Sequence, residues 1–181
     1  EFSNQIEFKS NIRLADTFTQ YDKEIDTATA THNENADGLE SSSNVALVYQ
    51  PNEKFTNKFT AANTYIKRRY QAAAGSGNTV KDNYYGERNA LIYSGSYNFN
   101  LDNSIVFGLE REDDEMGYNK NMTGMTYKDA YVTSSYFDIQ SRVTKNIFTT
   151  FGLRFDEHSL AGNEDSHRAT VAYLFDDKST K

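Results

Sequence analysis

Hydrophobic and polar residues alternate along this chain, most clearly between residues 146 and 175. In residues 147–155 the odd-numbered positions, such as Phe151 and Leu153, are mostly apolar. The even-numbered positions, such as Arg154, are mostly small or polar. This period of two is the period of a β-strand with one apolar face. Residues 168–175 repeat the alternation after a polar stretch, so we predict a hairpin with a long hydrophilic loop.

The same unit recurs along the whole chain and predicts eight strands. They are expected at residues 4–20, 54–71, 147–155 and 168–175, and around residues 45–49, 91–99, 105–109 and 131–139. The predicted connections alternate in length: long ones at about 21–43, 71–86, 112–127 and 157–167, and short ones at about 51–53, 100–103, 141–145 and 176–180. Long connections at one end and short turns at the other are expected of an up-and-down outer-membrane barrel.

The alternation also assigns faces to the strands. The apolar set is expected to face lipid, and its neighbours in sequence are expected to point inward. The outward set is Ile105, Phe107, Leu109, Ile147, Phe151 and Leu153, and the inward set is Gly108, Glu110, Thr150, Gly152 and Arg154.

The composition fits this fold. Only 37% of the residues are hydrophobic and the mean hydropathy is −0.78, yet the chain has 13 Tyr and 12 Phe, which argues against disorder. A barrel with a wet interior needs few aliphatic residues, because only alternate strand residues meet lipid. We therefore predict an all-β, antiparallel, up-and-down transmembrane β-barrel. The alternative is a soluble β-sandwich, whose strands are usually shorter.

Charge and cysteine content remove several classes of function. The net charge is −7, and the one basic cluster, Lys67, Arg68 and Arg69, is too short for a nucleic-acid interface. These three residues either meet lipopolysaccharide phosphates or form a solvated strand end. The absence of Cys excludes disulfides and thiolate sites from this chain.

Three segments resemble a known family: DAYVTSSY at residues 129–136, GLRFDEHS at 152–159, and the R-x-T-x-A-Y pattern at 168–173. They are similar to the mid-barrel of TonB-dependent outer-membrane receptors, and among these to the vitamin B12 (cobalamin) transporters. The resemblance implies a barrel of about 22 strands, of which residues 1–181 would be a partial barrel domain of about eight strands. The plug domain and the remaining strands would lie outside this piece.

The family implies a function as well as a fold. It implies uptake of a scarce ligand, such as cobalamin or a ferric siderophore, across the outer membrane of a Gram-negative bacterium. The implied partners are outer-membrane lipid and lipopolysaccharide, a small-molecule ligand, and TonB through the plug domain. Two alternatives stay open: a self-contained eight-stranded outer-membrane barrel with a structural or adhesive role, and a soluble secreted β-sandwich that binds a ligand.

A candidate calcium site precedes Gly38. Asn33, Asn35 and Asp37 occur at alternate positions, as oxygen ligands do in the first half of a calcium loop. Asp22 and Asp26 lie upstream and are expected to contribute. The segment from His32 onward, HNENADGLESSSNVALVYQPNEKFT, also resembles the calcium-holding part of the cobalamin transporters. The alternative is a solvated polar loop.

The last predicted loop carries the other candidate chemistry. Two histidines, His158 and His167, lie among several carboxylates and would suit a transition metal, although polar loops commonly have this composition. These carboxylates are Asp156, Glu157, Glu164 and Asp165. Asp156 and His158 resemble part of a catalytic dyad, but no Ser-centred motif accompanies them, so we expect no enzymatic activity.

Overall fold

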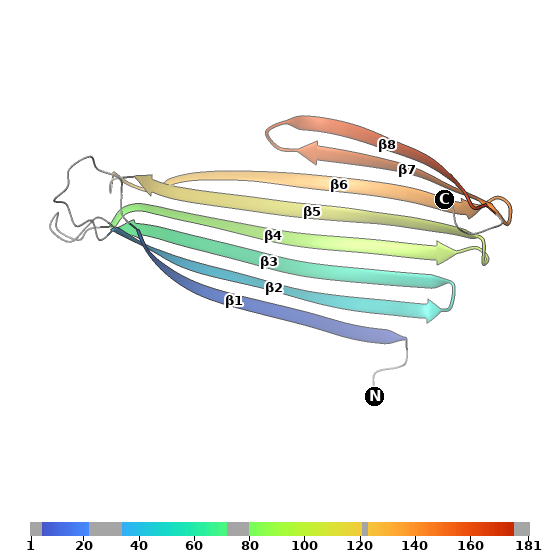
Figure 1. Ribbon diagram of the computed structural model, residues 1–181, viewed down its shortest axis with the longest axis horizontal. Coiled ribbons are helices and arrows are strands. Elements are labelled where there is room, and N and C mark those ends of the chain that lie inside the picture. Colours follow the sequence, from blue (N-terminus) through green and yellow to red (C-terminus); the bar gives the residue numbers. More distant parts are fainter. Residues whose placement is uncertain (1–4, 22–33, 72–79, 121–122, 176–181) are drawn as a thin grey trace.

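The computed structural model describes residues 5–21, 34–71, 80–120 and 123–175, and they form one antiparallel β-sheet. Its eight strands lie side by side in chain order, as Figure 1 shows. The strands are β1 (Ile6–Tyr21), β2 (Glu34–Asn52), β3 (Phe55–Gln71), β4 (Val80–Asn98), β5 (Asn103–Lys120), β6 (Thr126–Arg142), β7 (Ile147–His158) and β8 (Gly162–Tyr173). The predicted all-β, up-and-down meander is confirmed.

The pairing register separates the side chains into two faces. Directly opposite residues of antiparallel strands share a face, and successive residues take opposite faces. Phe107 therefore shares a face with Phe137 and Leu153, whereas Gly108 shares the other with Tyr136 and Arg154. We call these the apolar face and the polar face. The predicted separation of the two sets in β5 and β7 is confirmed.

Apolar residues on the apolar face form a continuous band over the half of the sheet nearest the short turns. We call it the apolar band. It consists of Ile6, Phe8, Ile12, Leu14, Val45, Leu47, Tyr49, Phe55, Phe59, Ala61, Leu91, Tyr93, Tyr97, Ile105, Phe107, Leu109, Phe137, Ile139, Ile147, Phe151, Leu153, Phe155, Ala169, Val171 and Tyr173. Nearer the long connections the same face turns polar, with Glu87, Asp113 and Asp129.

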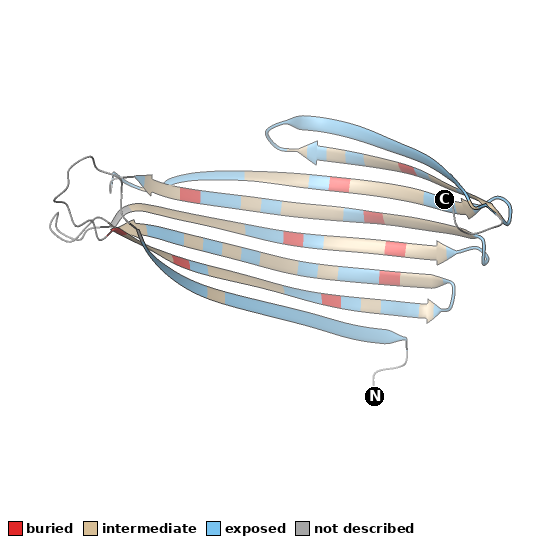
Figure 2. Ribbon diagram, in the orientation of Figure 1, coloured by how far each residue is buried: buried red, intermediate tan, exposed pale blue. Residues whose placement is uncertain are grey.

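The sheet is a single layer, and Figure 2 shows few buried positions along it. Ala46 and Ala90 are the only buried hydrophobic side chains among the described residues. Large side chains of the apolar band stay exposed, including Ile12 at 74% and Leu14 at 73%. Exposed apolar surface on this scale marks an interaction surface or a lipid contact. The described part of the chain holds no helix with the length and hydropathy needed to cross a bilayer.

The sheet is open. Within the described residues, β1 pairs only with β2 and β8 pairs only with β7, so no ladder joins the first strand to the last. The antiparallel sheet of the predicted barrel is therefore present without closure.

Several predicted long loops are wrong in part, because strands extend into them, while their residues 22–33, 72–79 and 121–122 lie outside the described residues. β2 begins at Glu34 inside the predicted loop 21–43, and β4 begins at Val80 inside the predicted loop 71–86. The prediction at 112–127 fails in the same way, since β5 runs to Lys120 and β6 starts at Thr126. These stretches carry few apolar residues and no sustained alternation. They still pair, because the ladder is made by backbone groups and not by the apolar pattern.

The connection predicted at 157–167 is a tight turn instead of a long loop. β7 continues to His158, and β8 resumes at Gly162 after residues 159–161. Gly162 has a φ of 86°, a left-handed conformation that suits glycine in a turn. The turns at 53–54, 99–102 and 143–146 lie close to their predicted places, and the one predicted at 176–180 lies outside the described residues.

Candidate functional site

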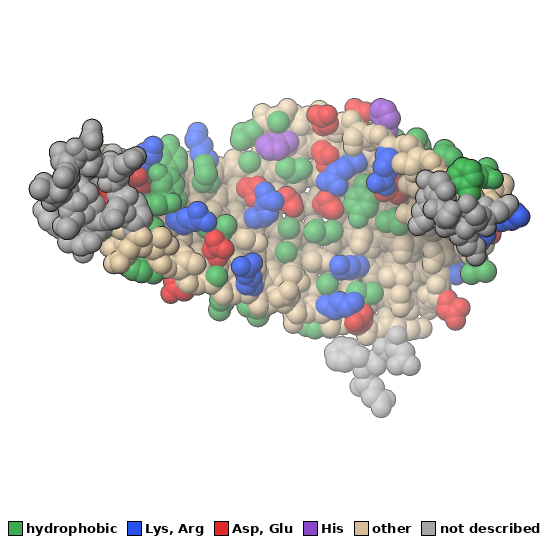
Figure 3. Space-filling view, viewed as in Figure 1, with side chains coloured by type: hydrophobic (Ala, Val, Ile, Leu, Met, Phe, Trp, Pro, Cys, Tyr) green, Lys and Arg blue, Asp and Glu red, His purple; other side chains and the backbone are tan. Residues whose placement is uncertain are grey.

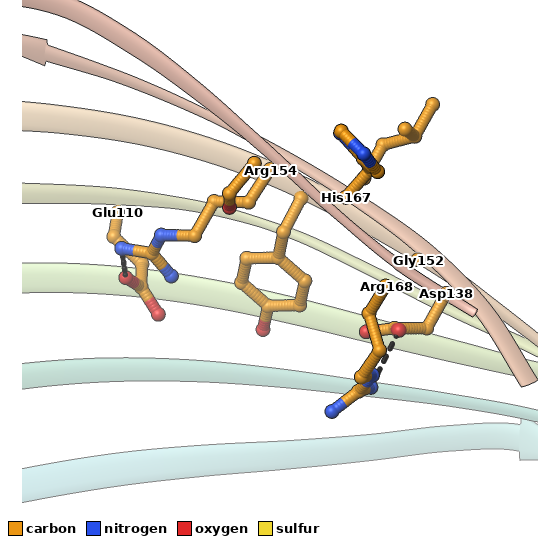
Figure 4. Close-up of a pocket in the computed structure, with 9 residues that line it drawn as sticks. Glu110, Asp138, Gly152, Arg154, His167 and Arg168 are labelled. Carbon is orange, nitrogen blue, oxygen red and sulfur yellow. Dashed lines mark hydrogen bonds and ion pairs between the residues drawn. The ribbon is translucent and has the colours of Figure 1, made fainter. Parts of the chain in front are cut away.

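A charge network on the polar face joins β5, β6 and β7 through Arg154. Arg154 Nε donates to both carboxylate oxygens of Asp156, at 2.9 and 3.0 Å. Its Nη2 donates to Glu110 Oε2 and to Ser134 Oγ, each at 2.9 Å. The Ser134 hydroxyl in turn donates to Asp156. Figure 4 shows Arg154 reaching toward Glu110 over the sheet.

The register builds this network from residues far apart in the sequence. Glu110, Ser134 and Asp156 stand directly opposite one another across three strands. Arg154 lies opposite Tyr136, and its guanidinium carbon is 6.0 Å from the centre of that ring. Ser134 is buried under the charged groups. Since the charged side chains are partly exposed, each ion pair contributes about 0.2–1 kcal/mol.

A second pair on the same face depends on a glycine. Asp138, Gly152 and Arg168 stand opposite one another on β6, β7 and β8. Arg168 Nη2 reaches across Gly152 to donate to Asp138 Oδ1 at 2.7 Å (Figure 4). A Cβ at Gly152 would overlap the Asp138 carboxylate. The two ion pairs line a shallow hollow of about 390 Å³. Because Gly152 has no side chain, Arg168 is able to reach Asp138 across it, and the hollow stays open.

A third charged group lies on the polar face nearer the long connections. Arg88 of β4 donates to Asp114 at 2.6 and 2.8 Å and lies 3.4 Å from Glu112. Figure 3 shows acidic and basic side chains beside one another on this face, among polar residues. Charged groups of this kind are favourable against water and costly against lipid.

The candidate calcium residues are only partly described. Asn35 and Asp37 lie in β2, on the polar end of the apolar face. Asp37 Oδ2 accepts from Gln71 Nε2 at 3.1 Å and lies 3.9 Å from Arg69. Asn33, Asp22 and Asp26 fall outside the described residues. Among the residues that the structure describes, no three His, Asp or Glu side chains gather at a metal-binding distance. Calcium stays a prediction.

The two candidate histidines do not come together. His158 lies on the polar face and His167 on the apolar face. His158 Nδ1 accepts from the backbone N–H groups of Leu160 and Ala161, at 3.0 and 3.2 Å, and so holds the β7–β8 turn. Asp156 is engaged by Arg154 and Ser134. The expectation of no enzymatic activity stays a prediction.

The basic cluster is split by the strand alternation. Lys67 and Arg69 lie on the apolar face beyond the apolar band, whereas Arg68 lies on the polar face. Arg68 lies 3.4 Å from Glu40, and Arg69 lies 3.9 Å from Asp37. The three cations therefore do not form one patch.

Polar contacts mark the place where the apolar band ends. Arg111 lies 3.8 Å from the centre of the Tyr131 ring and 2.7 Å from Asp113. Hydrogen bonds from Arg111 lower the pKa of Asp113. Farther along, the Tyr85 hydroxyl donates to Glu115, and this hydrogen bond raises the pKa of Tyr85 to about 12. Placing these charged groups in lipid would cost free energy, so this part of the face is expected to meet water.

No protein-family model matches this chain, and no curated protein matches it. Function is therefore inferred from the faces of the sheet and from the motifs. The sequence did indicate Arg154 and Glu110 as inward residues. It gave no sign that they meet, because the contact joins strands β5 and β7 through a register that alternation alone does not determine.

Proposed function

We propose that this chain forms eight neighbouring strands in the wall of an outer-membrane β-barrel. The observation that carries the proposal is the contrast between the two faces at one level of the sheet. The apolar band covers one face, while the other face at that level carries mostly small, polar or ion-paired residues. Lipid on one side and water on the other require this arrangement.

Strand length supports the same proposal. A membrane strand needs about 9–11 residues. β1–β6 have 16 to 19 residues each, so they extend beyond the apolar band on the side of the long connections. In the proposed barrel that side is external, since outer-membrane barrels carry their longer loops outside.

The single open layer favours a wall segment over the alternatives. A soluble sandwich covers its apolar face with a second sheet, and the described residues supply one sheet only. A self-contained eight-stranded barrel pairs its first strand with its last. The described β1 and β8 have free edges, which further strands of a larger barrel would cover.

The family resemblance directs the proposal to a TonB-dependent receptor. The three resembling segments, residues 129–136, 152–159 and 168–173, lie on the adjacent strands β6, β7 and β8. They supply Ser134, Arg154 and Asp156 to the charge network and Arg168 to the second pair. We propose that this face lines the interior of a receptor that takes up cobalamin or a ferric siderophore and contacts TonB through its plug domain.

Uptake tests the receptor function. Cells that lack the protein should lose energy-dependent uptake of radiolabelled cobalamin or of one ferric siderophore, and re-expression should restore it. As a control, the proton gradient across the inner membrane is collapsed, because uptake by simple diffusion would persist without it. Unchanged uptake of all these ligands would contradict the proposed receptor function. It would not contradict the proposed membrane wall, which has a separate test.

Calcium is a separate proposal for Asn33, Asn35 and Asp37, with Asp22 and Asp26. Its test is calcium titration of the intact protein with and without Asp37→Ala. A lower calcium affinity supports the site. An unchanged affinity would show that Asp37 is not a calcium ligand and contacts only Gln71 and Arg69.

A further inference from the structure

A shallow groove of about 650 Å³ crosses the polar face over β3–β6, between the charge network and the long connections. Ile66, Gly86, Met116 and Lys128 stand directly opposite one another on these four strands. Gly86 has no side chain, so the floor is open between Ile66 and Met116. Leu160, from the β7–β8 turn, closes one side.

The floor of the groove is apolar, and the next row of the same face, Thr64, Arg88 and Asp114, lines it with polar groups. Ile66 is 37% exposed and Met116 is 51% exposed. A Cβ built on Gly86 would meet nothing closer than a backbone oxygen at 4.0 Å, so the space above the floor is real. Tyr84 and Tyr118, paired in the next row toward the long connections, continue the apolar surface. Methionine adapts to varied ligand shapes.

One of the two cations that line the groove has no ion-pair partner within the described part of the chain. Arg88 is held by Asp114 at 2.6 Å. Lys128, beside Met116, makes no ion pair with any residue that the structure describes. Among the residues that the structure describes, the apolar floor therefore meets one positive charge without an ion pair at one end of the groove, a common arrangement in small-molecule sites.

We infer that this groove binds a small amphipathic acid. Its flat apolar body lies over Gly86 between Ile66 and Met116, and its anionic group pairs with Lys128. The inference rests on the proposed function, because a soluble ligand reaches the groove only if the polar face lines a water-filled interior. It goes beyond that function, because it adds a small amphipathic anion as a ligand of this wall beside the cobalamin or ferric siderophore proposed for uptake.

Three naphthalene probes test the inference: 2-naphthoate, the neutral 2-naphthylmethanol and the cationic 2-naphthylmethylamine. The full protein is held in lipid nanodiscs, and binding is measured by equilibrium dialysis against empty nanodiscs. Wild type should prefer the carboxylate. Lys128→Gln should weaken naphthoate about tenfold and leave the alcohol unchanged. Gly86→Val should abolish binding of the carboxylate and of the alcohol, because the valine side chain fills the space above the floor.

Lys58→Gln is the matched control, since Lys58 lies on the same face near the short turns. It should leave all three probes unchanged. The inference would be overturned if naphthoate bound the protein no more strongly than it binds empty nanodiscs. It would also be overturned if Gly86→Val left naphthoate binding unchanged. The proposed membrane wall has a separate test, the accessibility of spin labels on the two faces to oxygen and to a water-soluble reagent. Failure of the groove and failure of the wall are therefore distinguishable.

Discussion

At the scale of single residues, glycine decides where side chains of neighbouring strands are able to lie on the polar face. Gly108 stands opposite Tyr136, and the ring occupies the space above it. Gly86 stands opposite Met116, and the space above it is empty. The same residue type thus makes room for a ring at one position and opens a groove at the other.

Alanine at the two glycines should have opposite effects. Gly108→Ala should displace the Tyr136 ring and lower the free energy of unfolding by about 1–3 kcal/mol. Gly86→Ala meets no neighbour and should be neutral or stabilising, because glycine costs about 0.5–1 kcal/mol in a strand. Denaturant unfolding of the protein in detergent measures both. Equal effects would contradict the packing of Tyr136 over Gly108.

Removing the central arginine should destabilise the wall. Arg154→Met removes the donor that Glu110, Asp156 and Ser134 share and leaves Asp156 only its hydrogen bond from Ser134, so it should cost about 1–3 kcal/mol, measured by the same unfolding experiment. Arg13→Met is the control, because Arg13 lies on the polar face of β1 and makes no ion pair within the described residues. Similar losses in both variants would show that the network contributes no specific stability.

At the scale of the elements, the sequence predicted the strands wherever one face is apolar. The predictions at 4–20 and 54–71 agree with β1 and β3 to within a few residues. They failed where apolar residues are few, as in residues 112–120 of β5, where Met116 and Tyr118 are the only large apolar or aromatic residues in a polar run. Those residues are strand because β4 and β6 on both sides supply partners for their backbone groups.

Hydrogen exchange should show this difference directly. Backbone amides of residues 112–118 should exchange slowly in the intact protein, because strands pair with them on both sides. The amide of Leu101 serves as the fast reference, because Leu101 is fully exposed in the turn at 99–102 and its N–H donates no hydrogen bond within the described residues. Exchange in 112–118 as fast as at Leu101 would restore the loop that the sequence pattern predicted.

At the scale of the whole molecule, the alternation in the sequence predicted the two faces but neither the register nor the contacts that it creates. Phe151 and Arg154 were placed on opposite faces by their spacing alone. The meeting of Arg154 with Glu110 needed the order and register of β5, β6 and β7. The candidate calcium residues show the same limit, since Asn35 and Asp37 lie in a strand that their polar sequence did not reveal.

The most direct test of the proposed membrane wall is the accessibility of spin labels on neighbouring residues. The chain has no Cys, so single cysteines at Val106, Phe107, Thr150 and Phe151 label one site each. In membranes of the producing cells, labels at 107 and 151 should collide mainly with oxygen, which concentrates in lipid. Labels at 106 and 150 should collide mainly with a water-soluble nickel chelate. Nickel reaching both faces equally would contradict the account, because the apolar band would then not lie in lipid.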